Sequence, residues 1–420
     1  MPQTPPDSPP EIPRHDSYAA LRIPAFRWFI AAVVTQTLAS QMQAVVVGWQ
    51  VYEITRSPLS LGLIGLAEAI PFIGTVLLAG HWADRSDRKR LAVLATGLLW
   101  ICAAALLWLT LGHESARLKL TLIYVVVFVS GLARALLMPA RTALAGDIVP
   151  REALVNSVSW RSSSWQLAAV IGPAIGGGLY ALSGPALAYE VGIVLLAAGT
   201  IAYMKVPAVS MKAAATTEPL KQALGQGIGF VRSQPIFLGA ITLDLFAVLF
   251  GGAEALLPIF AADILNVGPE GLGILRAAHS AGAVAMSLYL SHRAPLQRPG
   301  RALLYAVGGF GLCMIGFGVS KVFLLSFGLL FCAGMLDNVS VLIRSSLLQT
   351  LTPAHLLGRV SAVNSIFIGS SNEIGAFESG VAASLMGTVP SVVFGGTMTL
   401  IVVLLTAWRV PELRRLGQIR

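Results

Sequence analysis

The sequence predicts an all-α membrane protein of twelve transmembrane helices, arranged as two pseudo-symmetric bundles of six helices each. Of its 420 residues 55% are hydrophobic and only 12% are charged, and the mean hydropathy is +0.76. Soluble domains carry roughly 25% charged residues, so this chain has too few charges to cover a surface exposed to water. The apolar residues form runs of about twenty, the length that crosses a hydrocarbon core of ~30 Å. The two halves of the chain also resemble each other.

Each expected helix is an apolar run that ends at charged residues, proline or glycine. The runs of the first half cover residues 26–54, 58–81, 91–111, 119–145, 154–182 and 186–206. The runs of the second half cover 236–263, 269–292, 300–319, 322–350, 356–387 and 389–409. The expected organisation is therefore a disordered tail (1–20), a six-helix bundle (21–206), a linker (207–235), a second six-helix bundle (236–410) and a tail (411–420). The linker is more polar and is expected to hold a short surface helix at 220–231.

Lysine and arginine are distributed unequally between the two sides of the expected membrane. Twenty of the 29 lie on the side of the N-terminus and five lie inside helices, which leaves four on the opposite side: Arg56, Arg117, Lys119 and Lys321. Cytoplasmic loops carry the excess of positive charge in membrane proteins. Both termini are therefore expected in the cytoplasm.

The two halves align with each other at two offsets. An offset of 211 residues places Gly62 on Gly273 and Glu68 on His279. An offset of 203 residues superposes three further pairs, which are Gly131 with Gly334, Arg134 with Asp337 and Arg141 with Arg344. The longer connection at 112–119 in the first half explains the change of offset. Internal repeats of this kind are typical of transporters.

Several other classes of protein are excluded by the pattern. The net charge of +9 does not indicate nucleic-acid binding, because the basic residues lie between apolar runs and form no basic face. The three cysteines lie inside apolar runs and are expected to pack there. The chain has no phosphate-binding Gly-x-x-x-x-Gly-Lys-Ser/Thr loop and no His-Glu-x-x-His motif, so neither an ATP-driven pump nor an enzyme is expected. No cofactor or metal is expected.

The most specific motif runs from Gly80 to Arg90 and is expected in a short cytoplasmic loop between the second and third helices. It reads Gly80-His-Trp-Ala-Asp84-Arg85-Ser-Asp87-Arg88-Lys89-Arg90. Glycine allows close helix approach, Asp84 is suited to the positive N-terminus of a neighbouring helix, and the basic cluster suits an anionic lipid surface. We interpret the motif as a gating element; simple anchoring by its basic residues is the alternative. The corresponding segment of the second half lacks an acidic residue.

A second motif, Gly172-Pro173-Ala-Ile-Gly176-Gly177-Gly178, lies within the fifth expected helix. Proline removes a backbone donor and favours a kink, and the glycines permit tight packing at the interface between the halves. Packing of small residues without any further role is an equally good interpretation.

These motifs resemble those of the major facilitator superfamily, and the Gly-Pro segment resembles an element of its exporters. Further segments resemble the bacterial branch that includes the enterobactin exporter; they are 42–55, 61–66, 139–141, 358–364 and 371–375. The resemblance covers nearly the whole chain. It implies the major facilitator fold and proton-driven export of a siderophore or another amphipathic small molecule across the bacterial inner membrane. The protein is expected to be a monomer.

Charged residues inside the expected helices are candidates for proton coupling or for a substrate cavity, because such residues cost about 2.5–3.5 kcal/mol at mid-membrane unless they face a cavity or a partner. The candidates are Glu373, Asp244, Glu68, Arg134, Asp337, Arg161 and His279. Arg134 and Asp337 are alternatively expected as an ion pair between the halves, and His279 as a packing residue. Arg141 and Arg344 lie near the cytoplasmic side and are expected to reach the membrane surface or to cap helices.

The function that these features favour is proton-coupled efflux by alternating access, with the substrate held between the bundles near mid-membrane. The expected partners are a small-molecule substrate, protons and the lipid bilayer, and not nucleic acid. An importer of the same fold is the nearest alternative. A non-transporting membrane receptor or secretion accessory is the alternative from another class.

Overall fold

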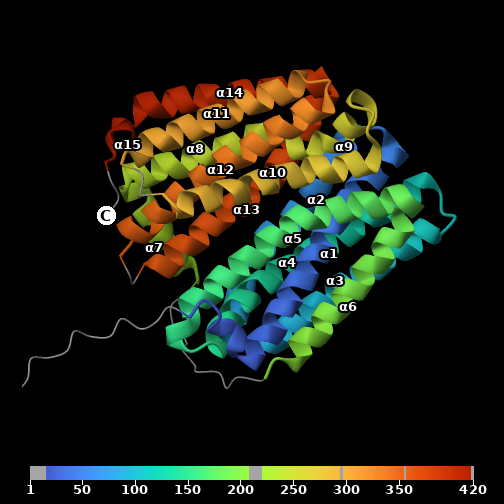
Figure 1. Cartoon of the computed structure of the whole chain (residues 1–420), viewed down its shortest axis with the longest axis horizontal. Coiled ribbons are helices and arrows are strands. Elements are labelled where there is room, and N and C mark those ends of the chain that lie inside the picture. Colours follow the sequence, from blue (N-terminus) through green and yellow to red (C-terminus); the bar gives the residue numbers. More distant parts are fainter. Residues whose placement is uncertain (1–15, 208–219, 294–296, 354–355, 418–420) are drawn as a thin grey trace, which may run out of the picture.

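The computed structural model describes residues 16–207, 220–293, 297–353 and 356–417, with side chains except at 76–78, 80–81, 83–85, 220–224 and 362. Within these ranges the chain is helical throughout, and its long helices form two groups that lie side by side (Figure 1). We call them the N bundle, which holds α1–α6, and the C bundle, which holds α8–α14.

The N bundle contains six long helices joined by short connections. They are α1 (Pro24–Thr55), α2 (Pro58–Arg85), α3 (Arg88–Leu111), α4 (Ala116–Ile148), α5 (Leu154–Ser183) and α6 (Pro185–Lys205). Pro24, Pro58 and Pro185 occupy the first turns of α1, α2 and α6, where the missing N–H of proline removes no helical hydrogen bond. Gly184, at a φ of 73°, makes the reversal from α5 to α6 in a conformation that favours glycine. All six helices match the expected runs to within a few residues.

The C bundle begins after α7 (Leu220–Ser233), the helix expected inside the linker. Its helices are α8 (Pro235–Gly251), α10 (Gly268–Ser291), α11 (Pro299–Val319), α12 (Phe323–Leu351), α13 (Leu357–Met386) and α14 (Thr388–Arg409), and α15 (Pro411–Arg415) follows. The residues 208–219 of the linker lie outside the described part of the chain.

The expectation of one continuous helix at 236–263 is wrong. α8 ends at Gly251, and the segment continues as a 3₁₀ turn (Ala253–Leu256), the short α9 (Leu257–Ile259) and a π-helical turn (Phe260–Ile264). The adjacent Gly251 and Gly252 disfavour a helix, and Pro258 has no N–H to donate. The break places Asp263 at the end of an irregular segment.

By length and composition, ten helices in the described part of the chain could cross a membrane. α10 and α13 are also long enough to cross a membrane, but they are more polar than these ten helices. α10 carries Arg276 and His279, and α13 carries Glu373 and Glu378. They are the two helices of the C bundle that contact the N bundle most extensively, α10 against α5 and α13 against α2. The two more polar helices therefore lie at the interface between the bundles.

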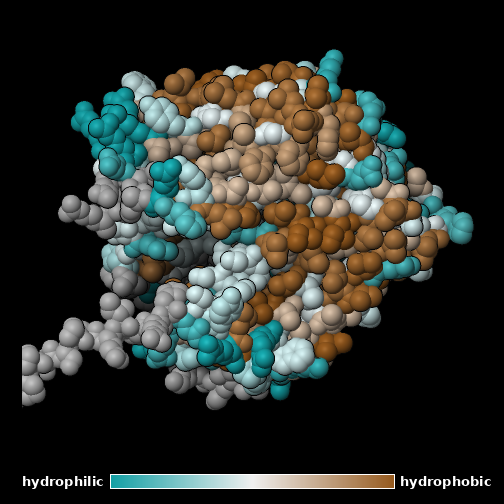
Figure 2. All heavy atoms as spheres, viewed as in Figure 1, coloured by the Kyte–Doolittle hydropathy of each residue, from teal (hydrophilic) through white to brown (hydrophobic). Residues whose placement is uncertain are grey.

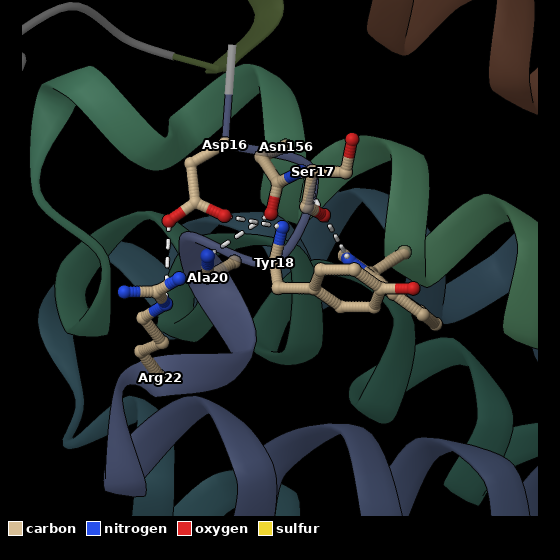
Figure 3. A network of polar contacts seen from close by, with 7 residues as sticks. Asp16, Ser17, Tyr18, Ala20, Arg22 and Asn156 are labelled. Atoms are coloured by element: carbon tan, nitrogen blue, oxygen red, sulfur yellow. Dashed lines mark hydrogen bonds and ion pairs between the residues drawn. The ribbon is translucent and has the colours of Figure 1, made fainter. Parts of the chain in front are cut away.

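The segment from Asp16 to Arg22 is held to α5 by hydrogen bonds. Asn156 donates to the backbone oxygen of Ser17 (2.7 Å) and accepts from the N–H of Ala20 (2.9 Å). Asp16 pairs with Arg22 at 3.2 Å, and Figure 3 shows these groups turned toward one another. Residues 16–20, which were expected to belong to a disordered tail, pack on the N bundle; residues 1–15 lie outside the described residues.

Candidate substrate pathway

The bundles share one apolar core at one end and have separate cores at the other. We call the end that carries α7 and α15 the terminal end (left in Figure 1), and the end that carries α9 the distal end. In the distal half one cluster of buried residues joins Val45 and Tyr52 of α1 to Phe260 and Leu272 of the C bundle. In the terminal half the buried clusters belong to one bundle each. The bundles therefore meet distally and separate toward the terminal end.

The burial along α5 and α10 follows the same division. The terminal half of α5, residues 154–167, has Ser157 as its single buried residue, whereas seven residues are buried between Ala168 and Tyr180. On α10, the buried residues end at Gly282, although the helix continues to Ser291. Figure 2 shows the corresponding hollow between the bundles at the terminal end, which we call the cleft. The space between the bundles is therefore open at the terminal end and closed at the distal end.

Backbone contact between glycines closes the distal half. Gly177 of α5 packs on Gly273 of α10: a Cβ at position 177 would lie 2.3 Å from the carbonyl oxygen of Pro269 and 3.0 Å from the Cα of Gly273. On the other side of the molecule, Gly62 of α2 packs on Gly380 of α13, where an added Cβ would lie 3.0 Å from the neighbouring Cα. Only residues without a Cβ allow these helices to approach so closely.

The exporter-like glycine element is divided between two contacts. Gly177 faces the C bundle, as described above, and the backbone oxygen of Pro173 approaches Gly273. Gly172 and Gly176 instead pack against Gln41 and Met42 of α1, inside the N bundle. α5 continues through Pro173 as one helix. The glycines of this element therefore make two kinds of contact. Gly177 packs against the C bundle, whereas Gly172 and Gly176 pack inside the N bundle.

Glu68 and Arg134 form an ion pair between α2 and α4 of the N bundle. Glu68 is 18% exposed and Arg134 is 49% exposed, so the arginine is the member that solvent reaches. In the C bundle His279 of α10 lies opposite Asp337 of α12, with 3.7 Å between Nε2 and Oδ2. The expected ion pair between Arg134 and Asp337 is therefore wrong, because each residue has its partner within its own bundle.

Asp244 of α8 and Arg344 of α12 form a buried ion pair, with 2.5 Å between Oδ2 and Nη1 and only 7% of each side chain exposed. The expectation that Arg344 reaches the membrane surface is thus wrong. Burying a charge is costly unless an opposite charge is placed beside it, and Asp244 provides that charge. The pair lies at a small pocket that Asn364 and Ser371 of α13 also line.

Glu373 of α13 is the candidate carboxylate that has no cation within 4 Å among the described residues. The charges of Arg134, Arg276 and Glu254 act on it. Arg134 belongs to the N bundle, whereas Arg276 and Glu254 belong to the C bundle. Glu373 is thus the carboxylate whose electrostatic surroundings depend on how the two bundles sit against each other.

Arg161 of α5 is half-buried in the terminal half of the N bundle, and the charge of Arg141 acts on it. Arg141 donates from Nη1 to the amide oxygen of Gln36 on α1, at 3.3 Å, and is also half-buried. The expectation that Arg141 reaches the membrane surface or caps a helix is wrong, since its recorded partner lies inside the bundle.

A network at the distal end was not identified from the sequence. Tyr52 of α1 donates its hydroxyl to Asp263 of the π-helical turn, and Arg56 pairs with the same carboxylate at 3.2 Å. Arg56 also stacks on the Tyr52 ring, at 5.3 Å from its centroid. Tyr52 and Arg56 belong to the N bundle and Asp263 to the C bundle, so the network links the bundles. One signal was available in the sequence: Arg56 is expected on the side opposite the N-terminus, and Asp263 ends the apolar run 236–263 on that same side with the opposite charge.

The motif at 80–90 is mostly helical and is not the loop expected from the sequence. α2 continues to Arg85, and only Ser86 and Asp87 connect it to α3. Asp87 caps α3, since its carboxylate accepts from the backbone N–H groups of Lys89 and Arg90 at 3.0 and 3.2 Å. The surroundings of Gly80 and the side chains of Asp84 and Arg85 lie outside the described part of the structure.

Arg88 holds the motif to α4. Its Nη1 lies 2.6 and 2.7 Å from the two carboxylate oxygens of Asp147, near the end of that helix. Arg90 pairs locally with Asp87, at 3.3 Å. Asp147 was not selected from the sequence, because an acidic residue near a helix end is ordinarily solvated.

The described residues offer no metal site, since no three His, Cys, Asp or Glu side chains among them converge as metal ligands would.

Two helical bundles with a cleft between them, charged side chains near the interface and glycine contacts that close one end define a membrane transporter of the major facilitator fold. Solved structures show the same fold. The chain superposes on a bacterial homologue of the human lysosomal transporter Spinster, in an inward-facing and occupied conformation, with a TM-score of 0.73, 12% identity and coverage of 95% and 99% of the two chains.

A D-xylose–proton symporter superposes with a TM-score of 0.70 at 13% identity, with 93% of this chain and 99% of that chain covered. The family model described as transmembrane secretion effector matches residues 15–418. This chain therefore belongs to the transmembrane secretion effector family of the major facilitator superfamily. It is 30% identical over 400 residues to the enterobactin exporter EntS of Citrobacter koseri, and 29% identical to that of Escherichia coli O1:K1, with 94% of each chain covered.

Proposed function

We propose that this protein exports a siderophore or another amphipathic small molecule across the bacterial inner membrane, by alternating access and in exchange for protons. The observation that carries the proposal is the cleft, open at the terminal end and closed distally by glycine contacts between the bundles. The basic residues at the terminal end favour the cytoplasm for that side. The names of the similar exporters support the outward direction and the class of cargo.

Proton coupling is assigned first to Glu373. Asp244 and Glu68 each have an arginine partner within their own bundle, whereas Glu373 responds to charges from both bundles. Protonation removes the negative charge of Glu373 and with it the attraction to Arg134 and Arg276. The relative free energies of the two open states then change, because the distances between these groups differ between the states.

The motif at 80–90 is proposed to act as a gate at the cytoplasmic surface. Its short connection and the Arg88–Asp147 pair fix the ends of α2, α3 and α4 relative to one another. Asp84→Asn and Gly80→Leu should then reduce transport while insertion and protein abundance stay near normal. Wild-type transport in both variants would leave the motif with an anchoring role only.

The direction is tested with inside-out membrane vesicles, labelled enterobactin as the probe and an acidified lumen. The protein should drive accumulation in these vesicles, and vesicles without the protein should show none. Accumulation only in right-side-out vesicles would instead identify an importer. The absence of flux in both orientations, with enterobactin bound to the purified protein, would favour a non-transporting receptor.

A further inference from the structure

Two half-buried arginines of the N bundle have no carboxylate partner among the described residues. Arg141 on α4 and Arg161 on α5 lie seven residues from the terminal ends of their helices, Ile148 and Leu154. Both are half-buried, and the charge of Arg141 acts on Arg161. Two like charges repel more strongly when water is partly excluded, and an anion bound beside them would relieve that repulsion.

None of the described carboxylates supplies that balance, since none lies within 4 Å of either guanidinium. Glu68 is paired with Arg134, and Asp147 is paired with Arg88. The recorded partner of Arg141 is the neutral amide of Gln36, whose own nitrogen donates to Ser40 at 3.0 Å. The negative end of the α4 dipole acts within the last helical turn only, and Arg141 lies about two turns before it.

A second observation comes from α6. The side chain of Tyr203 is fully buried, and its hydroxyl has no hydrogen-bond partner. The charges of Arg141 and Arg161 both act on this residue. Buried hydroxyls are ordinarily hydrogen-bonded, so an unpartnered one beside two arginines marks an unfilled polar position.

We propose that Arg141, Arg161 and the Tyr203 hydroxyl form a subsite for an anionic group of the transported molecule: a carboxylate, sulfonate, phosphate or ionised phenol. Guanidinium groups bind such oxygens through charge-assisted and often bidentate hydrogen bonds, and the tyrosine hydroxyl donates a further one. The arginines stand in the terminal half of α4 and α5, where the cleft is open. One part of this proposal rests on the proposed function, namely that the bound anion belongs to the transported molecule.

Binding to the purified protein tests the subsite without any gradient or flux. The protein is placed in nanodiscs of phosphatidylcholine, and equilibrium dialysis measures three probes with the same ring system: 1-naphthoate, neutral 1-naphthamide and cationic 1-naphthylmethylammonium. We expect 1-naphthoate to bind at least about tenfold more tightly than the other two. This factor corresponds to about 1.4 kcal/mol.

Arg141→Gln and Arg161→Gln should each remove most of this preference, and Arg161→Lys should retain part of it. Arg151→Gln, which removes an exposed arginine at the same end of the bundle, is the control and should change nothing. Thermal unfolding of each variant separates loss of the subsite from loss of the fold. Anion preference in wild type that persists in both glutamine variants would overturn the assignment.

Two further outcomes contradict the proposal. Equal affinities of wild type for the three probes would show that no anion subsite exists. Native mass spectrometry that finds phosphatidylglycerol bound to wild type but not to the Arg→Gln variants, with 1-naphthoate excluded by it, would assign the site to a lipid phosphate. Selective 1-naphthoate binding without enterobactin flux would leave the subsite intact and refute the proposed function alone.

Discussion

Gly62 of α2 and Gly380 of α13 are in backbone contact across the interface between the bundles, and a Cβ on Gly380 would lie 2.6 Å from the Cα of Gly62. Gly177 and Gly273 make the second such contact. The two contacts are related by the internal repeat: Gly62 aligns with Gly273 at an offset of 211 residues, and Gly177 aligns with Gly380 at an offset of 203. The distal half is therefore closed symmetrically.

Enlarging one of these glycines should keep the distal half from closing. Gly177→Ala is expected to cost about 1–3 kcal/mol in the closed state, because its Cβ would collide with the backbone at Pro269. The equilibrium should shift toward the distally open state, which spin labels at Leu59 and Leu385 would report as a longer distance between α2 and α13. Gly178→Ala is the control, since an added Cβ there has nothing within 4 Å. Equal effects of the two variants would contradict a closing role for Gly177.

Removing either member of the Asp244–Arg344 pair should destabilise the protein. Both side chains are 7% exposed, so Asp244→Asn or Arg344→Gln leaves an uncompensated buried charge, at a cost of about 3–5 kcal/mol. Thermal unfolding and protein abundance should both fall, and the double variant should recover part of the loss. Breaking the more exposed Arg88–Asp147 pair should cost only about 0–1 kcal/mol. Normal stability of Asp244→Asn together with loss of proton-driven transport would reassign Asp244 to coupling.

Glu373→Gln should abolish the coupling of transport to protons but preserve the exchange of cargo across the membrane. The amide cannot gain or lose a charge, so accumulation driven by a proton gradient should disappear, whereas exchange of labelled for unlabelled cargo should continue without its dependence on pH. Both are measured in the same vesicles. Glu378→Gln on the same helix is the matched control and should keep coupled accumulation. Full pH-dependent accumulation by Glu373→Gln would refute the assignment.

Asp263→Asn should weaken distal closure by removing the charge that Arg56 faces and reducing the strength of the hydrogen bond from Tyr52. The Arg56–Asp263 pair is exposed at 63% and 48%, and exposed pairs contribute only about 0–1 kcal/mol. The open population should therefore rise by no more than about fivefold, less at high salt, when followed with the labels at Leu59 and Leu385. Glu190→Gln, an exposed carboxylate of α6, should leave the label distance unchanged. A larger shift in Glu190→Gln than in Asp263→Asn would contradict the network.

The relation between the charge pairs is partly visible in the sequence. The repeat aligns Glu68 with His279 and Arg134 with Asp337, so Glu68–Arg134 and His279–Asp337 are equivalent pairs with the acidic and basic positions exchanged. The alignment identifies equivalent positions, but it does not state which of them touch. The sequence therefore left a pairing of Arg134 with Asp337 open, and only the folded chain excluded it.

The sequence by itself determined the all-helical membrane fold, its division into two bundles and the bounds of most helices, because apolar runs long enough to cross lipid must form helices whatever their neighbours are. It did not determine the break after Gly251, the burial of Arg344 or the partner of Asp263. Tertiary structure decided these, since pairing of charges depends on how helices distant in sequence rotate and pack against each other. The same packing set Gly177 on Gly273 and left Arg141 and Arg161 together without a carboxylate.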